Sequence, residues 1–255
     1  MATQSNNTID PDEKSRFEKY SRLWWDLDGP FWPLHGMNQL RTDLIREQLQ
    51  NQFGIDSRSQ DTPLKGLRIL DIGCGGGILS EVMARLGAEV HGIDMVEKNI
   101  GIARLHADQS GLDIDYRCCT VEDLCLEPNI FDVVLNMEVI EHVKNPDLFL
   151  HSAANLVRPG GLMFIATLNR TWLSYLLAIV AAEHILKLLP KGTHKWRKFQ
   201  RPDEVISSLG AYGFVPVNLS GVWINPFKRT FRRVPLTAVN YMLTFSNGMA
   251  TNNVT

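Results

Sequence analysis

Between Leu67 and Leu168 the chain alternates short apolar runs with segments of helical periodicity. The apolar runs have the length and composition of buried strands, and they are "LRILDIG", "EVHGID", "IDYRC", "FDVVLNM" and "LMFIATL". The segments between them repeat apolar residues at helical spacing, and they are "ILSEVMARLG", "KNIGIARLHADQSG" and "PDLFLHSAANLVRPGG", the last stopped by Pro-Gly-Gly. This alternation predicts an α/β fold, with a doubly wound, mostly parallel sheet covered on both faces. A ligand site is then expected at the carboxyl ends of the strands.

The residues ahead of Leu67 predict helices rather than strands. "SRFEKYSRLWWDLDGPFWPLH" has near-helical spacing of apolar residues until Gly29-Pro30 breaks it, and "MNQLRTDLIREQLQNQF" is a second helical pattern. "GIDSRSQDTP" is typical of a linker. We therefore expect an N-terminal helical cap and linker in residues 1–65 and a sheet domain in residues 66–255, which form one structural domain overall.

Charge is distributed unevenly along the chain. Residues 1–170 carry 16 Lys and Arg against 25 Asp and Glu, whereas residues 171–255 carry 10 against 3. A basic C-terminal third predicts contact with an anionic partner, either nucleic acid or a membrane surface. The four cysteines lack metal-ligand spacing, and the N-terminus has no features of a secretory or transit peptide. We therefore expect reduced thiols in a cytoplasmic protein.

The stretch "LDIGCGGG" ends the first predicted strand in a glycine-rich turn. A dinucleotide fingerprint needs glycines in the order G-x-G-x-x-G/A, and counted from Gly73 its third position is Ile78. Asp71 would also repel a pyrophosphate by about 4 kcal/mol at a separation of roughly 4 Å and an effective dielectric constant of about 20. The turn is therefore unsuited to a phosphate and suited to a cation.

S-adenosylmethionine meets these requirements, because it has a sulfonium, an ammonium group, a ribose diol and an adenine but no phosphate. Glycines let the backbone approach such a ligand closely. Asp94 ends the second strand, where its carboxylate can accept both ribose hydroxyls or can simply be a solvated strand end. Asp123, in "TVEDL" after the third strand, can accept from the adenine amino group or can cap a helix. Together the turn and the two carboxylates favour this cofactor.

Longer motifs resemble a known family. "LDIGCGGG", "GIDM" and "PGGLMFIATLNR" resemble the core of class I methyltransferases. "RLWWDLDGPFWPLHGMNQLR", "MEVIEHV", "PKGTHKWRKF" and "VNYM" resemble the ubiquinone-biosynthesis O-methyltransferases, and the resemblance extends from about Phe17 to Met242. It implies a Rossmann-like, seven-stranded sheet with a helical insertion after the fifth strand, at about residues 171–201. It also implies methylation of ring hydroxyls on polyprenylated phenols or quinols at two steps of ubiquinone synthesis.

The resemblance also implies cofactor-binding roles for Arg41, Gly73, Asp94 and Met137. Arg41 is a suitable partner for the carboxylate of the cofactor. Met137 could pack on the adenine. With neighbouring residues of the same motifs, the expected cofactor site consists of Arg41, Asp71, Gly73, Gly75, Asp94, Met95, Asp123 and Met137.

The segment "NMEVIEHV" carries the catalytic candidates. In a helix, Glu138, Glu141 and His142 would fall at positions i, i+3 and i+4 and share one face. The three side chains could hold a divalent ion that lowers the pKa of a phenol, and the family resemblance implies magnesium. Magnesium prefers oxygen ligands, so an alternative is that His142 acts directly as a general base. A further alternative is that this segment only shapes the pocket, as in metal-free relatives.

The expected insertion begins with "WLSYLLAIVAAEHILKLLP", whose apolar run is broken by Glu183, His184 and Lys187 and is therefore unsuited to spanning a bilayer. The following stretch, up to Arg201, carries five cations and Trp196 but no acid. This combination is typical of a segment that lies on an anionic bilayer. The alternatives are a lid helix packed wholly on the domain and a nucleic-acid surface, for which no line of stacking aromatics is evident.

We therefore expect an S-adenosylmethionine-dependent O-methyltransferase that is cytoplasmic and peripherally associated with the inner face of the membrane. Its expected partners are a polyprenyl phenol or quinol, an anionic membrane surface and other proteins of ubiquinone biosynthesis, but not nucleic acid. Two alternatives stay open. One is a methyltransferase for another lipid-like phenol or for carbon on a quinone ring, and the other is an inactive cofactor-binding scaffold of a lipid-synthesis assembly. The presence of Asp94, Glu138 and His142 favours an active enzyme.

Overall fold

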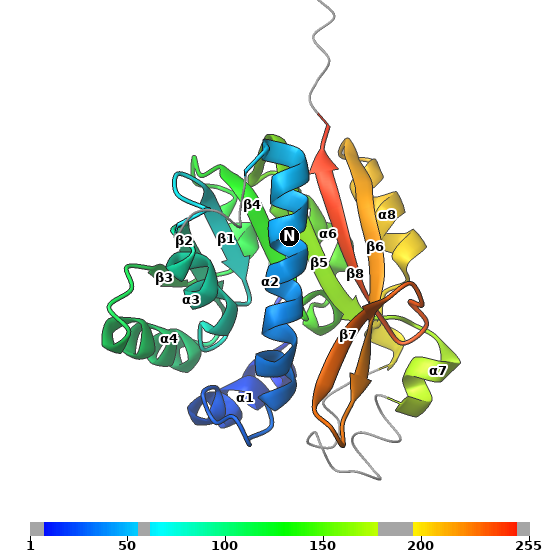
Figure 1. Cartoon of the computed structure of the whole chain (residues 1–255), viewed down its shortest axis with the longest axis horizontal. Coiled ribbons are helices and arrows are strands. Elements are labelled where there is room, and N and C mark those ends of the chain that lie inside the picture. Colours follow the sequence, from blue (N-terminus) through cyan, green and yellow to red (C-terminus); the bar gives the residue numbers. More distant parts are fainter. Residues whose placement is uncertain (1–7, 56–61, 178–195, 249–255) are drawn as a thin grey trace, which may run out of the picture.

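The computed structural model describes residues 8–55, 62–177 and 196–248. In this part of the chain, eight strands form one sheet in the order β3-β2-β1-β4-β5-β8-β6-β7 (Figure 1). The strands are β1 (Arg68–Ile72), β2 (Glu89–Asp94), β3 (Asp115–Cys118), β4 (Phe131–Met137), β5 (Val157–Leu168), β6 (Phe214–Asn225), β7 (Thr230–Val234) and β8 (Asn240–Asn247). β1 to β5 are parallel, whereas the β5–β8, β8–β6 and β6–β7 pairs are antiparallel. The expected α/β fold class is confirmed.

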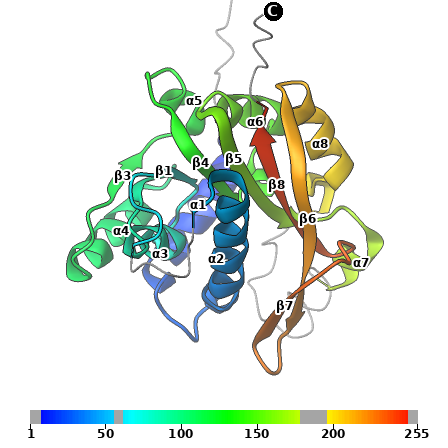
Figure 2. The same cartoon turned by 45° about the horizontal axis from the view of Figure 1, so that its top comes forward.

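Helices cover both faces of the sheet (Figures 1 and 2). The described α-helices are α1 (Pro11–Tyr20), α2 (Trp32–Phe53), α3 (Ile78–Arg85), α4 (Glu97–Gln109), α5 (Val121–Leu124), α6 (Pro146–Ala154), α7 (Trp172–Ser174) and α8 (Pro202–Gly210). The described 3-10 turns are η1 (Ser21–Leu23), η2 (Ile140–His142) and η4 (Trp196–Lys198). α2 and α3 pack on one face of the sheet, and α5, α6 and α8 pack on the other.

Successive residues of the central strands point to opposite faces, and both faces are covered, which explains the continuous apolar runs of these strands. Ile69 and Val133 belong to the core beneath α2, whereas Leu70 and Val134 belong to the core beneath α6. All four side chains are fully buried. The carboxyl ends of the same strands are therefore held by two packed layers, which fixes the positions of the side chains that follow them.

The N-terminal region is more than a cap. Leu44 and Leu49 of α2 are buried in the core of the sheet domain, so this helix is one of its structural layers. α2 begins at Trp32, well ahead of the expected start at Met37. Pro33 favours this early start, because a proline in the first turn of a helix lacks an N–H that the helix would leave unpaired.

Two expectations about the strands were wrong. Pro-Gly-Gly at 159–161 does not stop a helix, because α6 already ends at Ala154 and these three residues lie inside β5. The sheet also has one strand more than the seven expected, because β7 pairs with the second half of β6, Gly221–Asn225. The resulting β6–β7 hairpin projects beyond the neighbouring strands at one end of the molecule (Figures 1 and 2).

The helices that the structure describes include none with the length and apolar character needed to cross a membrane. Residues 178–195, which form the middle of the expected membrane-facing insertion, lie outside the described residues. Residues 56–61 of the expected linker also lie outside them.

Candidate active site

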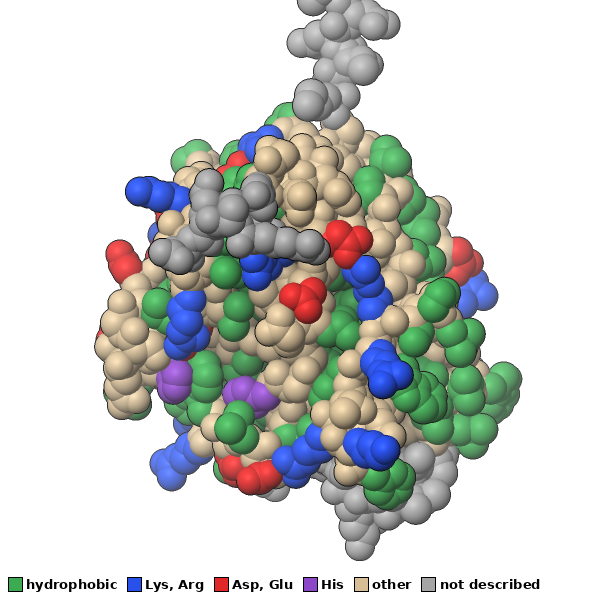
Figure 3. Space-filling model, viewed as in Figure 1, with side chains coloured by type: hydrophobic (Ala, Val, Ile, Leu, Met, Phe, Trp, Pro, Cys, Tyr) green, Lys and Arg blue, Asp and Glu red, His purple; other side chains and the backbone are tan. Residues whose placement is uncertain are grey.

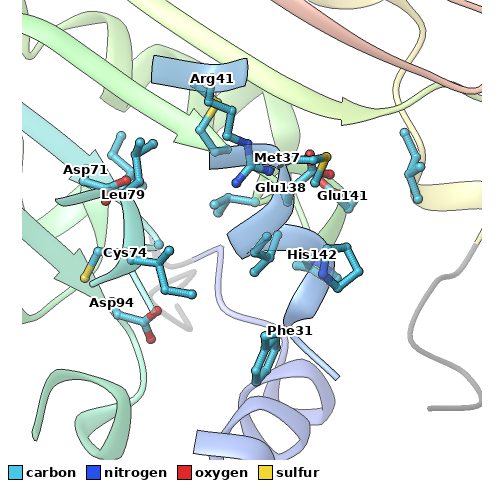
Figure 4. Close-up of a pocket in the computed structure, with 18 of the residues that line it drawn as sticks. Phe31, Met37, Arg41, Asp71, Cys74, Leu79, Asp94, Glu138, Glu141 and His142 are labelled. Carbon is cyan, nitrogen blue, oxygen red and sulfur yellow. Dashed lines mark hydrogen bonds and ion pairs between the residues drawn. The ribbon is translucent and has the colours of Figure 1, made fainter. Parts of the chain in front are cut away.

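The carboxyl ends of β1, β2 and β4 face a cavity of about 710 Å³. Its other walls come from α2, η2, the β6–β7 hairpin and Thr8–Asp10 at the start of the described chain. Figure 4 shows Asp71 and Asp94 on one side of this cavity, with Glu138 and His142 on the other. The volume falls in the range of roughly 300–1,000 Å³ that is usual for small-molecule sites.

The glycine turn after β1 forms the floor of the cavity on the Asp71 side. Gly73 has a φ of 67°, and a Cβ atom at this position would lie 2.5 Å from Cγ2 of Val139. Only glycine meets both constraints without strain. Gly75 donates its backbone N–H to Oδ2 of Asp94 at 3.0 Å, but it is not among the residues that line the cavity. Trp24 covers it, since a Cβ atom on Gly75 would lie 2.4 Å from the indole.

Asp71 and Asp94 both line the cavity, as expected. Asp71 accepts a hydrogen bond of 2.6 Å from Oγ of Ser80, and Oδ1 of Asp94 accepts one of 2.8 Å from the backbone N–H of Val96. Burial raises the pKa of each carboxyl to about 6. Two desolvated carboxylates that converge on one cavity favour a bound cation, which would compensate their charge.

Arg41 reaches this cavity from α2 and is itself buried. Its Nη2 donates to Oε1 of Glu138 at 3.1 Å. Burial has the largest effect on the pKa of Asp71, and the charge of Arg41 offsets part of that rise. Met95 and Met137, which follow β2 and end β4, line the cavity as expected. Arg41 is thus a buried cation that a carboxylate of a bound molecule could share with Glu138.

The catalytic candidates are not placed on one face of a helix, and that expectation was wrong. Glu138 has a φ of 59° and precedes η2, which is a single 3-10 turn. Glu141 and His142 belong to this turn, and all three side chains still line the cavity. The left-handed backbone at Glu138 brings its carboxyl next to that of Glu141, so the two acids meet by a route that helical spacing did not predict.

Glu141 is the most strongly perturbed acid of this group. It is buried, and its Oε2 accepts a hydrogen bond of 2.8 Å from Oγ1 of Thr167. Burial and, second, the charge of Glu138 raise the pKa of Glu141 well above its usual value. Glu141 therefore binds a proton more readily than an exposed glutamate does.

The three side chains do not form a ready metal site. Among the described residues, no group of three or more His, Cys, Asp or Glu side chains is arranged to hold a metal ion. Glu138 is paired with Arg41, and Glu141 is engaged by Thr167. An ion at these residues would therefore share Glu138 with Arg41 and Glu141 with Thr167.

Asp123 does not reach the cavity, which corrects its expected contact with adenine. It forms a capping box at the start of α5, where its Oδ2 accepts a 2.8 Å hydrogen bond from Oγ1 of Thr120. It is exposed, whereas the preceding residue, Glu122, is buried and lines the cavity. Oε1 of Glu122 accepts a 2.7 Å hydrogen bond from Oγ1 of Thr8, and its Oε2 has no hydrogen-bond partner among the described residues.

The sequence interpretation also missed the aromatic side chains that lie beside the glycine turn. Trp24 stacks on Phe31 with ring centroids 3.9 Å apart, and both residues line the cavity. The indole N–H of Trp24 donates to Oδ1 of Asn99 at 2.9 Å, which ties the N-terminal region to α4. Tryptophans and glycines were both visible in the sequence, but no local pattern indicates that Trp24 lies on Gly75.

A parallel β1–β5 sheet with a glycine turn after β1 and an aspartate at the end of β2 defines a class I, S-adenosylmethionine-dependent methyltransferase. A family model described as a methyltransferase domain matches residues 70–165. The ubiquinone biosynthesis O-methyltransferase of Sinorhizobium fredii is 50% identical over 243 residues, which cover 95% of this chain and 98% of that protein. That of Roseobacter denitrificans is 51% identical over 225 residues, with 88% and 90% coverage. The chain belongs to the ubiquinone biosynthesis O-methyltransferase family.

Solved structures agree on the fold. The magnesium protoporphyrin IX methyltransferase of Synechocystis, with bound SAH, superposes with a TM-score of 0.64 over 92% of this chain and 95% of that chain. The two proteins are 19% identical, so this likeness concerns the fold alone.

Proposed function

We propose that the protein transfers the methyl group of S-adenosylmethionine to a ring hydroxyl of a polyprenylated phenol or quinol in ubiquinone biosynthesis. The observation that carries this proposal is the two-ended character of the cavity. One end has the carboxylates of Asp71 and Asp94, and the other has apolar side chains such as Leu168, Ile224 and Val239. A cationic methyl donor suits the first end, and a prenylated ring suits the second.

At the cofactor end, the residue contacts suggest an orientation. Asp94 accepts the ribose hydroxyls, and Arg41 takes the carboxylate of the cofactor and releases part of its interaction with Glu138. Asp71 supplies negative charge near the methionine part. Glu122 replaces Asp123 as our candidate for the adenine end, because its buried Oε2 still needs a donor. Met95 and Met137 pack around these polar contacts.

At the catalytic end, His142 is our candidate general base. It lines the cavity on the side opposite Asp94, so a ring held between the two faces both groups. Methyl transfer from a sulfonium needs in-line alignment and removal of the phenolic proton, and little covalent assistance. The imidazole of His142 takes the proton, while the Glu141–Thr167 contact fixes the turn that carries it.

A magnesium ion at Glu138, Glu141 and His142 is the second candidate mechanism. Cofactor binding supports it indirectly, because a cofactor carboxylate on Arg41 would free Glu138 from its ion pair. Exhaustive chelation separates the two mechanisms. Loss of turnover that added magnesium restores would support the ion, and unchanged turnover would leave His142 as the base.

Peripheral attachment to an anionic membrane is part of the same proposal. Trp172 and Tyr175 are exposed at the start of the insertion, and the ring of Trp172 lies 5.6 Å from that of Trp196 at its far end. An exposed aromatic group of this kind suits a membrane interface. The expected basic cluster is weaker than its sequence suggests, because Lys198 pairs with Asp10 at 2.6 Å. Other proteins of ubiquinone biosynthesis stay candidate partners.

Radiolabel transfer tests the proposed activity. The purified protein is incubated with methyl-labelled S-adenosylmethionine and either a prenylated catechol or a soluble catechol with the same ring. Label on the ring oxygen of both supports O-methylation. Label on ring carbon would favour the quinone alternative. Cofactor binding without transfer to any acceptor would favour the inactive scaffold.

A further inference from the structure

The β6–β7 hairpin has an outer surface that the proposed chemistry does not use. Its residues 222–234 include four cations and no acid. Figure 3 shows Lys and Arg side chains gathered over β7, with hydrophobic side chains beside them. We propose that the tip of this hairpin inserts into the interface of an anionic lipid bilayer and thereby holds the mouth of the cavity against the membrane. This inference rests on the proposed function, because a polyprenylated substrate resides in a bilayer.

The inner face of the hairpin is fixed to α2. The ring of Phe231 lies 5.8 Å from that of Trp32, and a Cβ atom on Gly36 would lie within 2.1 Å of Phe231. The guanidinium of Arg229 lies 5.1 Å from the Trp32 ring centroid and pairs with Asp28 at 2.7 Å. These contacts hold the hairpin in place, so the orientation of its tip and outer face is set by the fold.

The outer face and the tip combine aromatic side chains with cations. Trp223 and Arg232 are direct partners in the β6–β7 pair, and both are exposed. Phe227 at the tip is 84% exposed. Oδ1 of Asn225 accepts from the backbone N–H groups of Phe227 and Lys228 at 3.1 and 3.0 Å, which fixes the turn that presents the phenyl ring. Exposed aromatic rings beside Lys and Arg are the side chains that anchor proteins at membrane interfaces.

The charge on this surface is only partly neutralised. Arg233 pairs with Glu47 at 2.7 Å, as Arg229 does with Asp28. Lys228 and Arg232, in contrast, form no ion pair with any other described residue. Lys228 directly follows Phe227 in the sequence, and Arg232 lies on β7. Both cations suit lipid phosphates. Charge complementarity therefore favours an anionic bilayer over a neutral one.

The position of the hairpin beside the cavity connects the membrane contact with substrate binding. Phe227 and Trp223 are exposed and also line the cavity, as does Leu177 at the start of the insertion. The cavity therefore opens beside the hairpin tip. A prenyl tail attached to a ring inside the cavity can leave along these apolar side chains and remain in the bilayer. With the tip inserted, the tail would not have to cross water.

Vesicle flotation of the full chain tests the contact. Vesicles of phosphatidylcholine with phosphatidylglycerol should bind the wild type, binding should weaken with salt, and phosphatidylcholine alone should bind poorly. Phe227→Ala should weaken partition about tenfold, because one phenyl ring leaves the apolar phase. Phe227→Trp should restore it. Leu126→Ala is the matched control, because Leu126 is 85% exposed and follows α5, which Figure 2 places at the end opposite β7.

Removal of one cation separates docking from chemistry. Arg232→Ala should weaken binding to anionic vesicles about fivefold and lower turnover of a vesicle-embedded prenylated catechol in parallel. Its turnover of a soluble catechol should equal that of the wild type, and Lys65→Ala, an exposed lysine elsewhere, should change neither. Equal binding by the Phe227 and Arg232 variants and the wild type would overturn the proposal, as would wild-type protein that binds no vesicle. If the wild type methylated neither catechol, the proposed function would fail, whatever the vesicles showed.

Discussion

The two ends of the cavity differ in how far apart along the chain their residues lie. The cofactor end comes mainly from one βαβ unit, in which the turn at Gly73 and the carboxylate of Asp94 lie within two consecutive strands and their loops. The substrate end combines α2, η2, the end of β5 and the β6–β7 hairpin, which are far apart along the chain. The first end buries the carboxylates of Asp71 and Asp94, whereas the second joins the polar turn η2 to apolar walls. Local motifs therefore describe the cofactor end, whereas only the folded chain describes the substrate end.

The two ends of the cavity also differ in the energy of burying their side chains. At the cofactor end the fold buries Asp71 and Asp94, and this burial raises the pKa of each carboxyl to about 6. At the substrate end the apolar walls gain from any apolar ligand, whatever its chemistry. If this is correct, substitutions at one end should leave the other end unchanged.

The largest expected effect is that of His142→Ala. Loss of a general base typically costs about 10²- to 10⁴-fold in rate, so kcat should fall by this factor. Affinity for S-adenosylhomocysteine should stay within about twofold of the wild type, because His142 lies on the opposite side of the cavity from Asp94. Steady-state kinetics and calorimetry measure the two quantities. A kcat within about tenfold of the wild type would remove His142 from proton transfer.

The second prediction concerns Asp94→Ala and is confined to the cofactor end. Removal of a charged hydrogen-bond acceptor should weaken binding of S-adenosylhomocysteine, which retains the ribose, by about 1.5–3 kcal/mol in calorimetry. Asp123→Ala is the matched control, because this aspartate caps α5 and is exposed. It should leave cofactor affinity unchanged and lower stability by about 0.5–1 kcal/mol. Equal losses of affinity in the two variants would contradict the assignment of Asp94 and the correction of Asp123.

The third prediction concerns the stability of the cofactor-free protein. The pKa of Asp71 is about 6 in the folded chain against 3.8 as its ordinary value, so the folded state binds more protons between these pH values. Its stability contribution is therefore most favourable below about pH 4 and is lost as pH rises through about 6. Asp71→Asn keeps a partner for Ser80 but removes the buried charge. It should raise the free energy of unfolding by about 3 kcal/mol at pH 8, because a shift of about two pKa units corresponds to about 1.4 kcal/mol per unit.

Urea unfolding of both proteins at pH 4 and pH 8 measures this gain, which should nearly vanish at the lower pH. A gain of equal size at both pH values would show that the carboxylate charge is not its cause. Cofactor affinity of the Asp71→Asn variant should fall at the same time, since the stabilising change removes the charge that the sulfonium cofactor needs.

These differences explain which parts of the fold and of the candidate site could be predicted from the sequence. The parallel strands and the position of Asp94 at the end of the second strand were predicted correctly, because apolar runs and glycine turns are local signals. The helical placement of Glu138 failed because that residue adopts a left-handed conformation, which spacing alone cannot reveal. Asp123 and Glu122 are adjacent acids, and only the orientation of α5 decides which of them faces the cavity.

The substrate end was the least predictable region. β7 was not anticipated, and Phe231 on this strand packs near Trp32, a residue from the opposite end of the chain. The contact of Trp24 with Gly75 could not be predicted for the same reason, because it joins two elements that are far apart in the sequence. Contacts of this kind leave no periodic trace in either segment.

The smallest expected effect tests the apolar end directly. Leu177 lines the cavity, whereas Leu173, in the same segment and equally exposed at 42%, does not. Leu177→Ala should raise the KM for a prenylated catechol about fivefold, or about 1 kcal/mol, because part of one side chain no longer covers the tail. The KM for a soluble catechol and the cofactor affinity should not change, and Leu173→Ala should behave as the wild type in detergent solution. A rise in KM for both catechols would place Leu177 against the ring instead of the tail. Equal effects of Leu177→Ala and Leu173→Ala would mean that the segment acts through general apolarity rather than as a wall of the cavity.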